Sequence, residues 1–235
     1  MKSFKDYHNI DEGINDPAIF KAVFMAGGPG SGKSFLAGKS ALTSLGLKLI
    51  NSDNIFEKAL VKAGMSLTPK DIFSVKGQTI IRPVAKALTL KKQDAALIGR
   101  VGFIIDGTGK EYDRIRNQKA GLNTLGYDTM MIFVNTDVET AIKRNRARSR
   151  SLPDAQIKKM WQAVQNNLGK FQGLFKNDFL IVDNSEGADI KTASLVGYKF
   201  VSKWVRKDHQ NQIAKQWIEK EKKQRGVKTV KPHKN

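Results

Sequence analysis

The segment that decides the fold is Gly27-Gly28-Pro29-Gly30-Ser31-Gly32-Lys33-Ser34. It follows a short apolar run over residues 22–25 and opens an amphipathic stretch over residues 33–45. A glycine-rich loop between a strand and a helix lets backbone N–H groups turn inward, and the helix start adds its positive dipole end. The segment therefore predicts a site for a chain of phosphates.

The loop has the spacing G-x-x-x-x-G-K-S, in which particular positions have chemical roles. Lys33 is expected to reach the β and γ phosphates as a point charge, and Ser34 to give its hydroxyl to Mg²⁺. The residues predicted to bind the nucleotide here are Gly28, Pro29, Gly30, Ser31, Gly32, Lys33, Ser34 and Phe35. The alternative is a glycine-rich turn without a ligand.

Short apolar runs alternate with longer amphipathic stretches on both sides of this loop. The runs are rich in Ile, Val, Phe and Met, which is typical of strands buried in a parallel sheet. They cover residues 22–25, 48–51, 103–105, 129–134 and 179–182. The predicted helices cover residues 33–45, 54–63, 69–98, 111–125, 137–149 and 154–172. This alternation predicts an α/β fold, a doubly wound parallel sheet of five strands with helices on both faces.

The composition divides the chain into three parts. Residues 1–20 are polar and form an N-terminal arm, and residues 21–202 form the nucleotide-binding domain. That domain contains a helical insertion at about 64–98 and a lid at about 143–153. Residues 203–235 hold eleven Lys or Arg and three Asp or Glu, which predicts a basic C-terminal helix and tail. The tail is either a solvated terminus or a contact for a phosphate backbone.

Charge and composition limit the classes of function. The chain has 41 Lys or Arg against 22 Asp or Glu, a net charge of +19 in 235 residues. This excess favours a polyanionic partner, with nucleic acid first and an anionic membrane surface second. The absence of cysteine excludes a disulfide-linked partner. The three histidines lie outside the middle of the chain, so we do not expect a histidine metal cluster. Without an 18-residue apolar run or a secretory start, we expect a cytoplasmic protein with no membrane span.

Two carboxylates follow predicted strands. Asp53 comes after the strand at 48–51, where it would face the ligand crevice and accept the proton of an attacking hydroxyl. The alternative for Asp53 is an N-cap of the following helix. Asp106 ends the strand Phe-Ile-Ile-Asp, a usual position for holding Mg²⁺ through water. The alternative for Asp106 is a turn before Gly107.

A dense basic run follows the fourth strand. Five of the eight residues at 143–150 are cationic, and Arg144 and Arg148 share one helix face. Arginine forks suit phosphate oxygens, which favours a lid that closes over the phosphates. The alternative is a solvated basic helix end. After the last strand, Asn184 is a candidate for the adenine edge, with turn formation as the alternative.

These motifs taken in order resemble a known group. GGPGSGKS, INSDN, IIDGTG, AIKRNRARSRSLP and VDNS follow the order seen in P-loop polynucleotide kinases of the T-even phage type, over about residues 20–185. Zeta-toxin-like P-loop kinases and phage DNA hydroxymethyluracil kinases are also similar. The resemblance implies ATP or GTP as donor, Mg²⁺, and phosphoryl transfer to a hydroxyl. By position it implies catalytic roles for Lys33, Asp53, Arg144 and Arg148, and metal binding by Ser34.

The acceptor stays open at this point. The charge favours a nucleic acid, phosphorylated at a 5′-hydroxyl or at a hydroxymethylated base. The alternatives are a zeta-like kinase of a nucleotide sugar or small nucleotide, and a nucleic-acid-binding ATPase. Trp161, Phe171 and Phe175 either stack bases near the lid or form a core stripe. Arg82, in the insertion, is a candidate acceptor contact, and the sequence does not indicate the oligomeric state.

Overall fold

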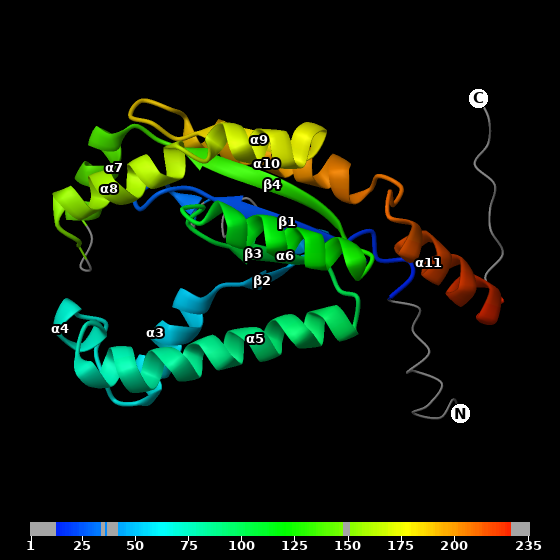
Figure 1. The fold of residues 1–235 in the computed structure, drawn as a ribbon, viewed down its shortest axis with the longest axis horizontal. Coiled ribbons are helices and arrows are strands. Elements are labelled where there is room, and N and C mark those ends of the chain that lie inside the picture. Colours follow the sequence, from blue (N-terminus) through cyan, green and yellow to red (C-terminus); the bar gives the residue numbers. More distant parts are fainter. Residues whose placement is uncertain (1–12, 34–35, 37–41, 148–150, 227–235) are drawn as a thin grey trace.

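The protein has a parallel five-stranded sheet in the order β2-β3-β1-β4-β5. The structure is a computed structural model that describes residues 13–33, 36, 42–147 and 151–226 (Figure 1). The predicted α/β fold is confirmed, because every neighbouring pair of strands in this sheet is parallel. The strands are β1 (Lys21–Ala26), β2 (Lys48–Ile50), β3 (Phe103–Asp106), β4 (Asp128–Asn135) and β5 (Phe179–Asp183).

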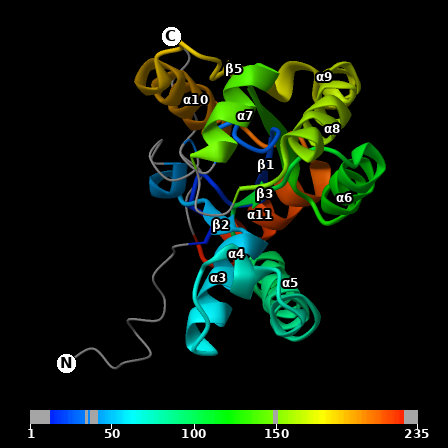
Figure 2. The same ribbon diagram turned by 90° about the vertical axis from the view of Figure 1, so that its left-hand side faces the viewer.

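Helices fill the connections between these strands and continue after the last one. In the described ranges they are η1 (Leu42–Leu45), α3 (Ser52–Lys62), α4 (Pro69–Ile72), η2 (Lys76–Ile81), α5 (Arg82–Ile98), α6 (Tyr112–Thr124), α7 (Val138–Arg146), α8 (Asp154–Gln165), α9 (Leu168–Phe175), η3 (Lys176–Asp178), α10 (Ile190–Val205) and α11 (Gln212–Gln224). Helices lie on both sides of the sheet in Figure 2, which makes a three-layer sandwich. No helix in the described part of the chain is long and apolar enough to cross a bilayer.

Alternate side chains of the central strand β1 supply the two cores. Phe24 belongs to the core that α6, α9 and α11 cover, whereas Val23 and Met25 belong to the core under η1 and α10. Successive side chains of a strand point to opposite faces, so a strand covered on both sides must be apolar throughout. All six residues of β1 are buried, including Lys21 at its start.

The strand order puts the phosphate loop at the switch point of the sheet. β1 lies between β3 and β4, and Met25 of β1 is level with Asp106 of β3. The backbone N–H of Gly27 donates to the carbonyl of Thr108 at 3.1 Å, which joins the loops that follow β1 and β3. Ligands of open α/β sheets bind at the carboxyl ends of the strands, where neighbouring connections diverge. Figure 2 looks onto this end, with α7 and α8 on one side and α3 and α4 on the other.

The predicted helix at 69–98 is wrong as a single element. It is divided into α4, the π-helical turn η2 and α5, with a small core of its own around Phe56, Leu60, Ile72 and Ala85. The helix is interrupted at residues 73–74, and Pro83, in the first turn of α5, accounts for the π-helical turn that precedes α5 without a gap. Proline has no N–H, and inside a continuous helix its ring clashes with the carbonyl four residues earlier. The wider turn before it closes with a bond from the Arg82 N–H to the carbonyl of Gly77.

The predicted helix at 154–172 is also divided, at Asn166 and Asn167. The side chain of Asn167 donates to the carbonyls of Gly109 (3.1 Å) and Lys110 (3.0 Å), so α9 is tied to the loop after β3. The predicted basic C-terminal helix corresponds to α11, within the described residues. Ala214 and Ile218 of α11 are buried in the core, and the proposed domain boundary at 202–203 falls within α10.

Candidate active site

Two glycines of the phosphate loop are required by its geometry. Gly30 has φ +78°, and a Cβ there would lie 2.6 Å from the carbonyl oxygen of Ala141 in α7. Gly27 has φ +155°, and its Cβ would lie 2.6 Å from the carbonyl oxygen of Val134. Side chains are strained at such φ values and meet backbone here, so the loop can pass this close to β4 and α7 only with glycine. The loop is therefore held against the end of β4 and one face of α7.

Lys33 lies across this loop. Its Nζ donates to the carbonyls of Gly27 at 2.6 Å and Gly28 at 3.3 Å. Ser31 lies inside the loop, and its Oγ is buried with no hydrogen-bond partner in the structure. Buried hydroxyls are normally satisfied, so this atom indicates a ligand with oxygen or nitrogen atoms at the loop. A phosphate chain is a ligand of that kind.

Lys33, Asp53 and Asp106 share one electrostatic environment. Burial raises the pKa of Asp106, the nearby Lys33 ammonium opposes that rise, and the Asp53 carboxylate adds to it. Lys33 and Asp53 therefore both act on one carboxyl group, although they come from different segments. The three residues that the sequence separated by up to 73 positions are brought to one end of the sheet.

Asn51 connects two of these residues, and sequence reasoning missed it. Its Nδ2 donates to Oδ2 of Asp106 at 2.6 Å, and its Oδ1 accepts from the backbone N–H of Asp53 at 2.7 Å. Asn51 is thus the N-cap of α3, so the alternative that made Asp53 the cap is wrong. The sequence does contain a signal for this cap. Asn51 directly precedes the Ser-Asp that starts the helix, and Asn is one of the preferred N-cap residues.

Arg82 reaches the site from the insertion. Its Nη1 lies 3.7 Å from Oδ1 of Asp53, and its guanidinium lies 4.3 Å from the centre of the Phe56 ring. The Nε of Arg82 is buried with no hydrogen-bond partner in the structure. The Asp53 side chain is half exposed, so the pair lies at the surface of the crevice rather than in the core. The sequence-based candidate Arg82 is therefore beside the candidate base.

Arg144 and Asn184 brace the loop from the other side. Nη1 of Arg144 donates to the carbonyls of Asn184 at 2.7 Å and Gly30 at 3.4 Å. Asn184 is buried, and its Nδ2 donates to the carbonyl of Ser31 at 2.7 Å. The Oδ1 of Asn184 is buried without a hydrogen-bond partner in the structure. Both side chains thus contact the loop backbone, which is a different contact from the adenine edge and the γ phosphate considered from the sequence.

The aromatic residues near the lid have different locations. Phe171 and Phe175 are buried in the core with Phe24, so base stacking by these two residues is excluded. Trp161 is partly exposed; its Nε1 donates to the carbonyl of Thr136 at 2.7 Å. A Cβ on Gly28 would lie 3.8 Å from the Cα of Trp161, which puts α8 directly over the phosphate loop.

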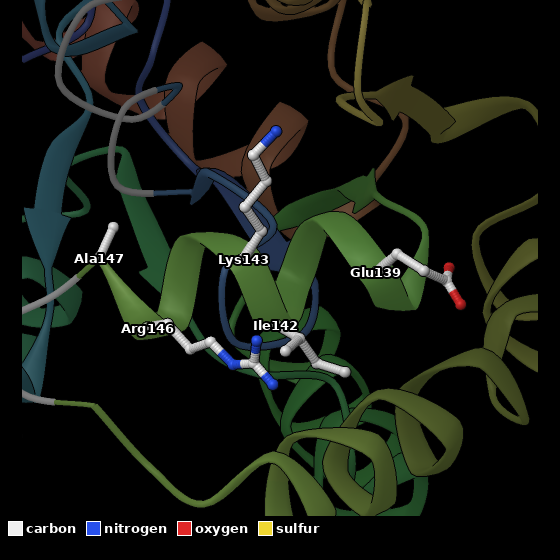
Figure 3. A pocket seen from close by; sticks show the side chains of 5 residues that line it. All are labelled: Glu139, Ile142, Lys143, Arg146 and Ala147. Carbon is white, nitrogen blue, oxygen red and sulfur yellow. The ribbon is translucent and has the colours of Figure 1, made fainter.

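The basic run of α7 is engaged with protein groups where it is described. Lys143 pairs with Glu186, and Arg146 pairs with Asp154 at the start of α8. A shallow hollow of about 600 Å³ follows the outer face of α7 and is lined by Glu139, Ile142, Lys143, Arg146 and Ala147 (Figure 3). None of the loop residues lines it, so it is separate from the phosphate site. The candidates Ser34, Phe35 and Arg148 lie outside the described residues.

The residues present fit a nucleotide with a divalent cation. The carboxylates of Asp53 and Asp106 repel each other, and burial disfavours the charge on Asp106. A cation with oxygen ligands would stabilise that arrangement, and Mg²⁺ is commonly held by one or two carboxylates, waters and phosphates. The described residues contain no cluster of three or more acidic or histidine side chains. A cation here would therefore depend on the phosphates for its remaining ligands.

The chain is similar to known proteins. An AAA domain model, AAA_33, matches residues 23–166. Adenylate kinase isoenzyme 5 of Bos taurus is 29% identical over 136 residues, which are 57% of this chain and 23% of that protein. The chain thus spans about a quarter of the length of this curated relative.

Solved structures are similar at lower identity. A shikimate kinase from Bacteroides thetaiotaomicron is 16% identical with a TM-score of 0.48, covering 77% of this chain and 98% of that one. A chain of the Pnkp1/Rnl/Hen1 RNA repair complex is 22% identical with a TM-score of 0.46, covering 64% and 46%. The family model covers the loop, Asp53, Asp106 and the whole predicted lid, and it matches more than half of the chain. The chain therefore belongs to the AAA_33 family of AAA domains.

Proposed function

We propose that this chain is a kinase that transfers the γ phosphate of ATP to a hydroxyl group of a nucleic acid, with Mg²⁺ as cofactor. The observation that carries the proposal is the convergence of Lys33, Asp53 and Asp106 at one end of the sheet. A positive charge for the phosphates, a carboxylate for the metal and a second carboxylate for the acceptor are the groups that phosphoryl transfer uses. ATP as the donor and a nucleic-acid hydroxyl as the acceptor are both proposed here.

In the proposed step, the acceptor oxygen attacks the γ phosphorus, and the bond between that phosphorus and the β–γ bridging oxygen breaks. Asp53 takes the proton of the hydroxyl, and ADP is the leaving group. Lys33 and the backbone N–H groups of the loop stabilise the charge on the phosphate oxygens. Bound Mg²⁺ would neutralise further phosphate charge, and Asp106 and Ser34 are the residues that would hold it.

The Asp53–Arg82 pair supports an acceptor next to Asp53. The Arg82 side chain is 28% exposed, and a guanidinium has five N–H donors, so it has donors for an oxygen of the acceptor besides its contact with Asp53. The Phe56 ring below the guanidinium holds it in place, because a cation over an aromatic face is attracted by the ring quadrupole. Arg82 thus orients the acceptor hydroxyl toward the base, while Asn51 orients the base.

The net charge of +19 supports a nucleic acid as the molecule that carries this hydroxyl. Each phosphate that a lysine or arginine neutralises releases counterions, so a basic protein gains affinity for a polynucleotide with every contact. Lys110 and Arg114 follow Asp106 in the chain and have side-chain exposures of 48% and 77%. Both pair with Glu111, at 3.6 Å and 3.7 Å. Exposed ion pairs of this kind contribute little, so the oxygens of a phosphate backbone can take the place of Glu111.

A small nucleotide or nucleotide sugar is the second candidate acceptor. The sequence similarity to an adenylate kinase isoenzyme over 136 residues favours it. The insertion also favours it, because Arg82 and Asp53 form a compact pair that a small anionic molecule would suffice to fill. Such an acceptor leaves the net charge without a function in catalysis.

A transfer assay with ATP labelled at the γ phosphate separates these proposals. The acceptor panel contains DNA and RNA with 5′-hydroxyl ends, hydroxymethylated DNA, nucleoside monophosphates and nucleotide sugars, with Lys33→Ala as the inactive control. Label in DNA or RNA supports the nucleic-acid acceptor, and label only in a small molecule supports the second candidate. Release of label only as free phosphate, stimulated by DNA, overturns the kinase proposal and indicates an ATPase.

A further inference from the structure

The insertion carries most of the exposed apolar surface of the protein. Fourteen large apolar side chains in the described ranges are exposed, and nine of them lie between residues 61 and 98. Apolar side chains scattered singly on a surface are normal, but a group on one subdomain indicates an interaction surface. The group includes four residues along α5, which are Val84 (51% exposed), Leu88 (47%), Leu90 (61%) and Ile98 (78%). Val84, Leu88 and Ile98 lie on one side of the helix, whereas Leu90, two residues after Leu88, faces another side.

These residues follow a heptad pattern on the outer face of α5. Val84, Leu88, Lys91, Ala95 and Ile98 are spaced by four, three, four and three residues, which is the spacing of a coiled-coil seam. Lys91 and Ala95 are exposed as well. We call these five residues the α5 seam. Its length of about two heptads suits a helix of the same size as α5.

The seam is separate from the packing that holds α5 in the domain. Ala85 and Ala96 are the buried residues of α5, and Ala85 packs with Phe56, Leu60 and Ile72 in the small core of the insertion. Figures 1 and 2 both show α5 at the margin of the molecule, with no other described helix along its outer side. The inner face of α5 is therefore already covered, and the seam is the face that a partner can cover.

We propose that a second copy of this chain covers the α5 seam, with the two α5 helices antiparallel across a two-fold axis near residue 93. In this arrangement Leu88 of each copy packs against Ile98 of the other, and Lys91 of each lies beside Ala95 of the other. A two-fold interface uses the same patch on both subunits, so the patch must be complementary to itself. Leu88 and Ile98 meet this condition because they lie at equal distances from residue 93, whereas Val84 lies beyond the overlap of the two helices.

Charge complementarity favours a second copy of this chain as the partner and an antiparallel arrangement of the two α5 helices. Asp94 flanks the seam next to Ala95 and is exposed, so in the antiparallel pair it lies beside Lys91 of the second copy. The symmetry makes this ion pair twice. A parallel pair would instead put Lys91 against Lys91, and like charges at a seam are destabilising. A polar residue at one seam position is a known way of specifying register at some cost in affinity.

The proposed dimer is independent of the acceptor. The seam lies on the outer face of α5, whereas Arg82 at the start of α5 contacts Asp53 and Phe56 on the inner side. Ala95 has a small side chain, and the exposed Ala87 beside Leu88 has one too, so the two helices can approach closely. Kinase activity per chain is therefore expected to be the same in seam variants as in the wild type.

Sedimentation equilibrium over about a hundredfold range of concentration measures the dimer. We expect Leu88→Asp to weaken dimerisation by about tenfold or more, since a carboxylate would enter an apolar layer. Leu195→Asp is the matched control, because Leu195 on α10 has a similar exposure of 51%. Lys91→Asp should weaken the dimer about fivefold, and Lys91→Asp with Asp94→Lys should restore it. A wild-type chain that is monomeric throughout, or a dimer that Leu88→Asp leaves unchanged, overturns the proposal.

Cysteine crosslinking tests the direction, because the natural chain has no cysteine. Leu88→Cys with Ile98→Cys should form a disulfide-linked dimer on mild oxidation, whereas neither single variant should do so. A crosslink in the Leu88→Cys single variant would show a parallel pair and overturn the antiparallel arrangement. Circular dichroism of each variant shows whether the chain is folded. If Leu88→Asp does not fold, the crosslinking result alone decides between the outcomes.

Discussion

Asn51 joins the carboxyl ends of two strands by donating from Nδ2 to Oδ2 of Asp106 at 2.6 Å, while it caps α3 through Oδ1. One short side chain thus positions the candidate metal ligand and the first turn that carries Asp53. The amide is suited to both tasks because it has a donor for the carboxylate and an acceptor for the helix N–H groups. Neither Asp nor Ser offers the same combination at this distance.

Asn51→Asp should separate these two tasks. The carboxylate keeps the cap of α3, but it replaces a donor to Asp106 with a like charge, which would raise the pKa of Asp106 further. We expect a higher Mg²⁺ requirement and a kcat that begins to fall at a higher pH than in the wild type, with a thermal midpoint close to that of the wild type. Titration of activity with Mg²⁺ at several pH values measures this. Asn51→Ala, which also removes the cap, should in addition lose about 1 kcal/mol of stability. An unchanged Mg²⁺ requirement in Asn51→Asp would count against Asp106 as a metal ligand.

Asp53→Asn tests the base. The amide keeps the size of the side chain but cannot accept the hydroxyl proton, so we expect kcat to fall by about 10²–10⁴-fold with ATP affinity nearly unchanged. Single-turnover transfer and equilibrium ATP binding measure the two quantities. Asp113→Asn, an exposed carboxylate on α6, is the control and should have wild-type kcat. A large loss of ATP affinity in Asp53→Asn would assign Asp53 to the metal or to the structure instead.

Arg82→Ala tests the acceptor contact. Loss of a charged donor should raise the KM for the acceptor by about 10–100-fold, and the ATP dissociation constant should stay the same. Steady-state kinetics with each substrate varied in turn gives both values. Arg114→Ala removes an exposed arginine with a side-chain exposure of 77% and serves as the control for loss of charge. A higher ATP dissociation constant in Arg82→Ala would indicate that Arg82 contacts ATP and not the acceptor.

Asp128 lies at the opposite end of the sheet from the phosphate loop. We expect it to make the stability of the fold depend on pH. Burial alone would raise its pKa, but hydrogen bonds and charges from His209, Lys21 and the Gln210 N–H hold it well below the usual value. A carboxyl whose folded pKa is depressed stabilises the fold above its unfolded pKa, about 3.9, and loses that contribution as pH falls toward the folded value. We expect Asp128→Asn to cost about 3–5 kcal/mol at pH 7, because it leaves the buried Lys21 ammonium unpaired.

That cost should shrink as the pH falls below about 4, because the unfolded wild-type chain then binds a proton at Asp128, while the folded carboxyl stays ionised until the pH nears its lowered pKa. Urea unfolding of both proteins at a series of pH values measures the difference. Asp113→Asn breaks an exposed ion pair with Arg116 and should change stability by less than about 1 kcal/mol at every pH. A pH-independent difference between wild type and Asp128→Asn would contradict the proposed pairing.

Removal of residues 227–235 tests the basic tail. The deletion takes away Lys228, Lys231 and Lys234, so the slope of the logarithm of polynucleotide affinity against that of salt should flatten by about 0.9 for each phosphate that the tail neutralises in the intact protein. Fluorescence anisotropy at several salt concentrations measures the slope. A 235-residue chain with these three lysines changed to Gln should behave like the deletion. Equal slopes in all three proteins would show that the tail does not bind the phosphate backbone.

The helical insertion shows where local prediction fails. Residues 69–98 have helical periodicity, and nothing in that pattern indicates how the chain accommodates Pro83. The π turn before it depends on the packing of α4 and α5 around Ile72 and Ala85, which is a contact between segments distant in sequence. The division of the predicted helix at 154–172 has the same origin, since Asn167 uses its side chain on the loop after β3.

The sequence by itself determined the phosphate loop, the five parallel strands and the carboxylates at their ends. These features are local, because glycine, apolar runs and strand-end Asp act through their own backbone and side-chain chemistry. Only the tertiary structure decided that Asn51 links Asp53 to Asp106, that Arg82 lies beside Asp53, and that Arg144 and Asn184 contact the loop backbone. Those relationships join segments up to 153 residues apart, and they exist only when the sheet has brought its strand ends together.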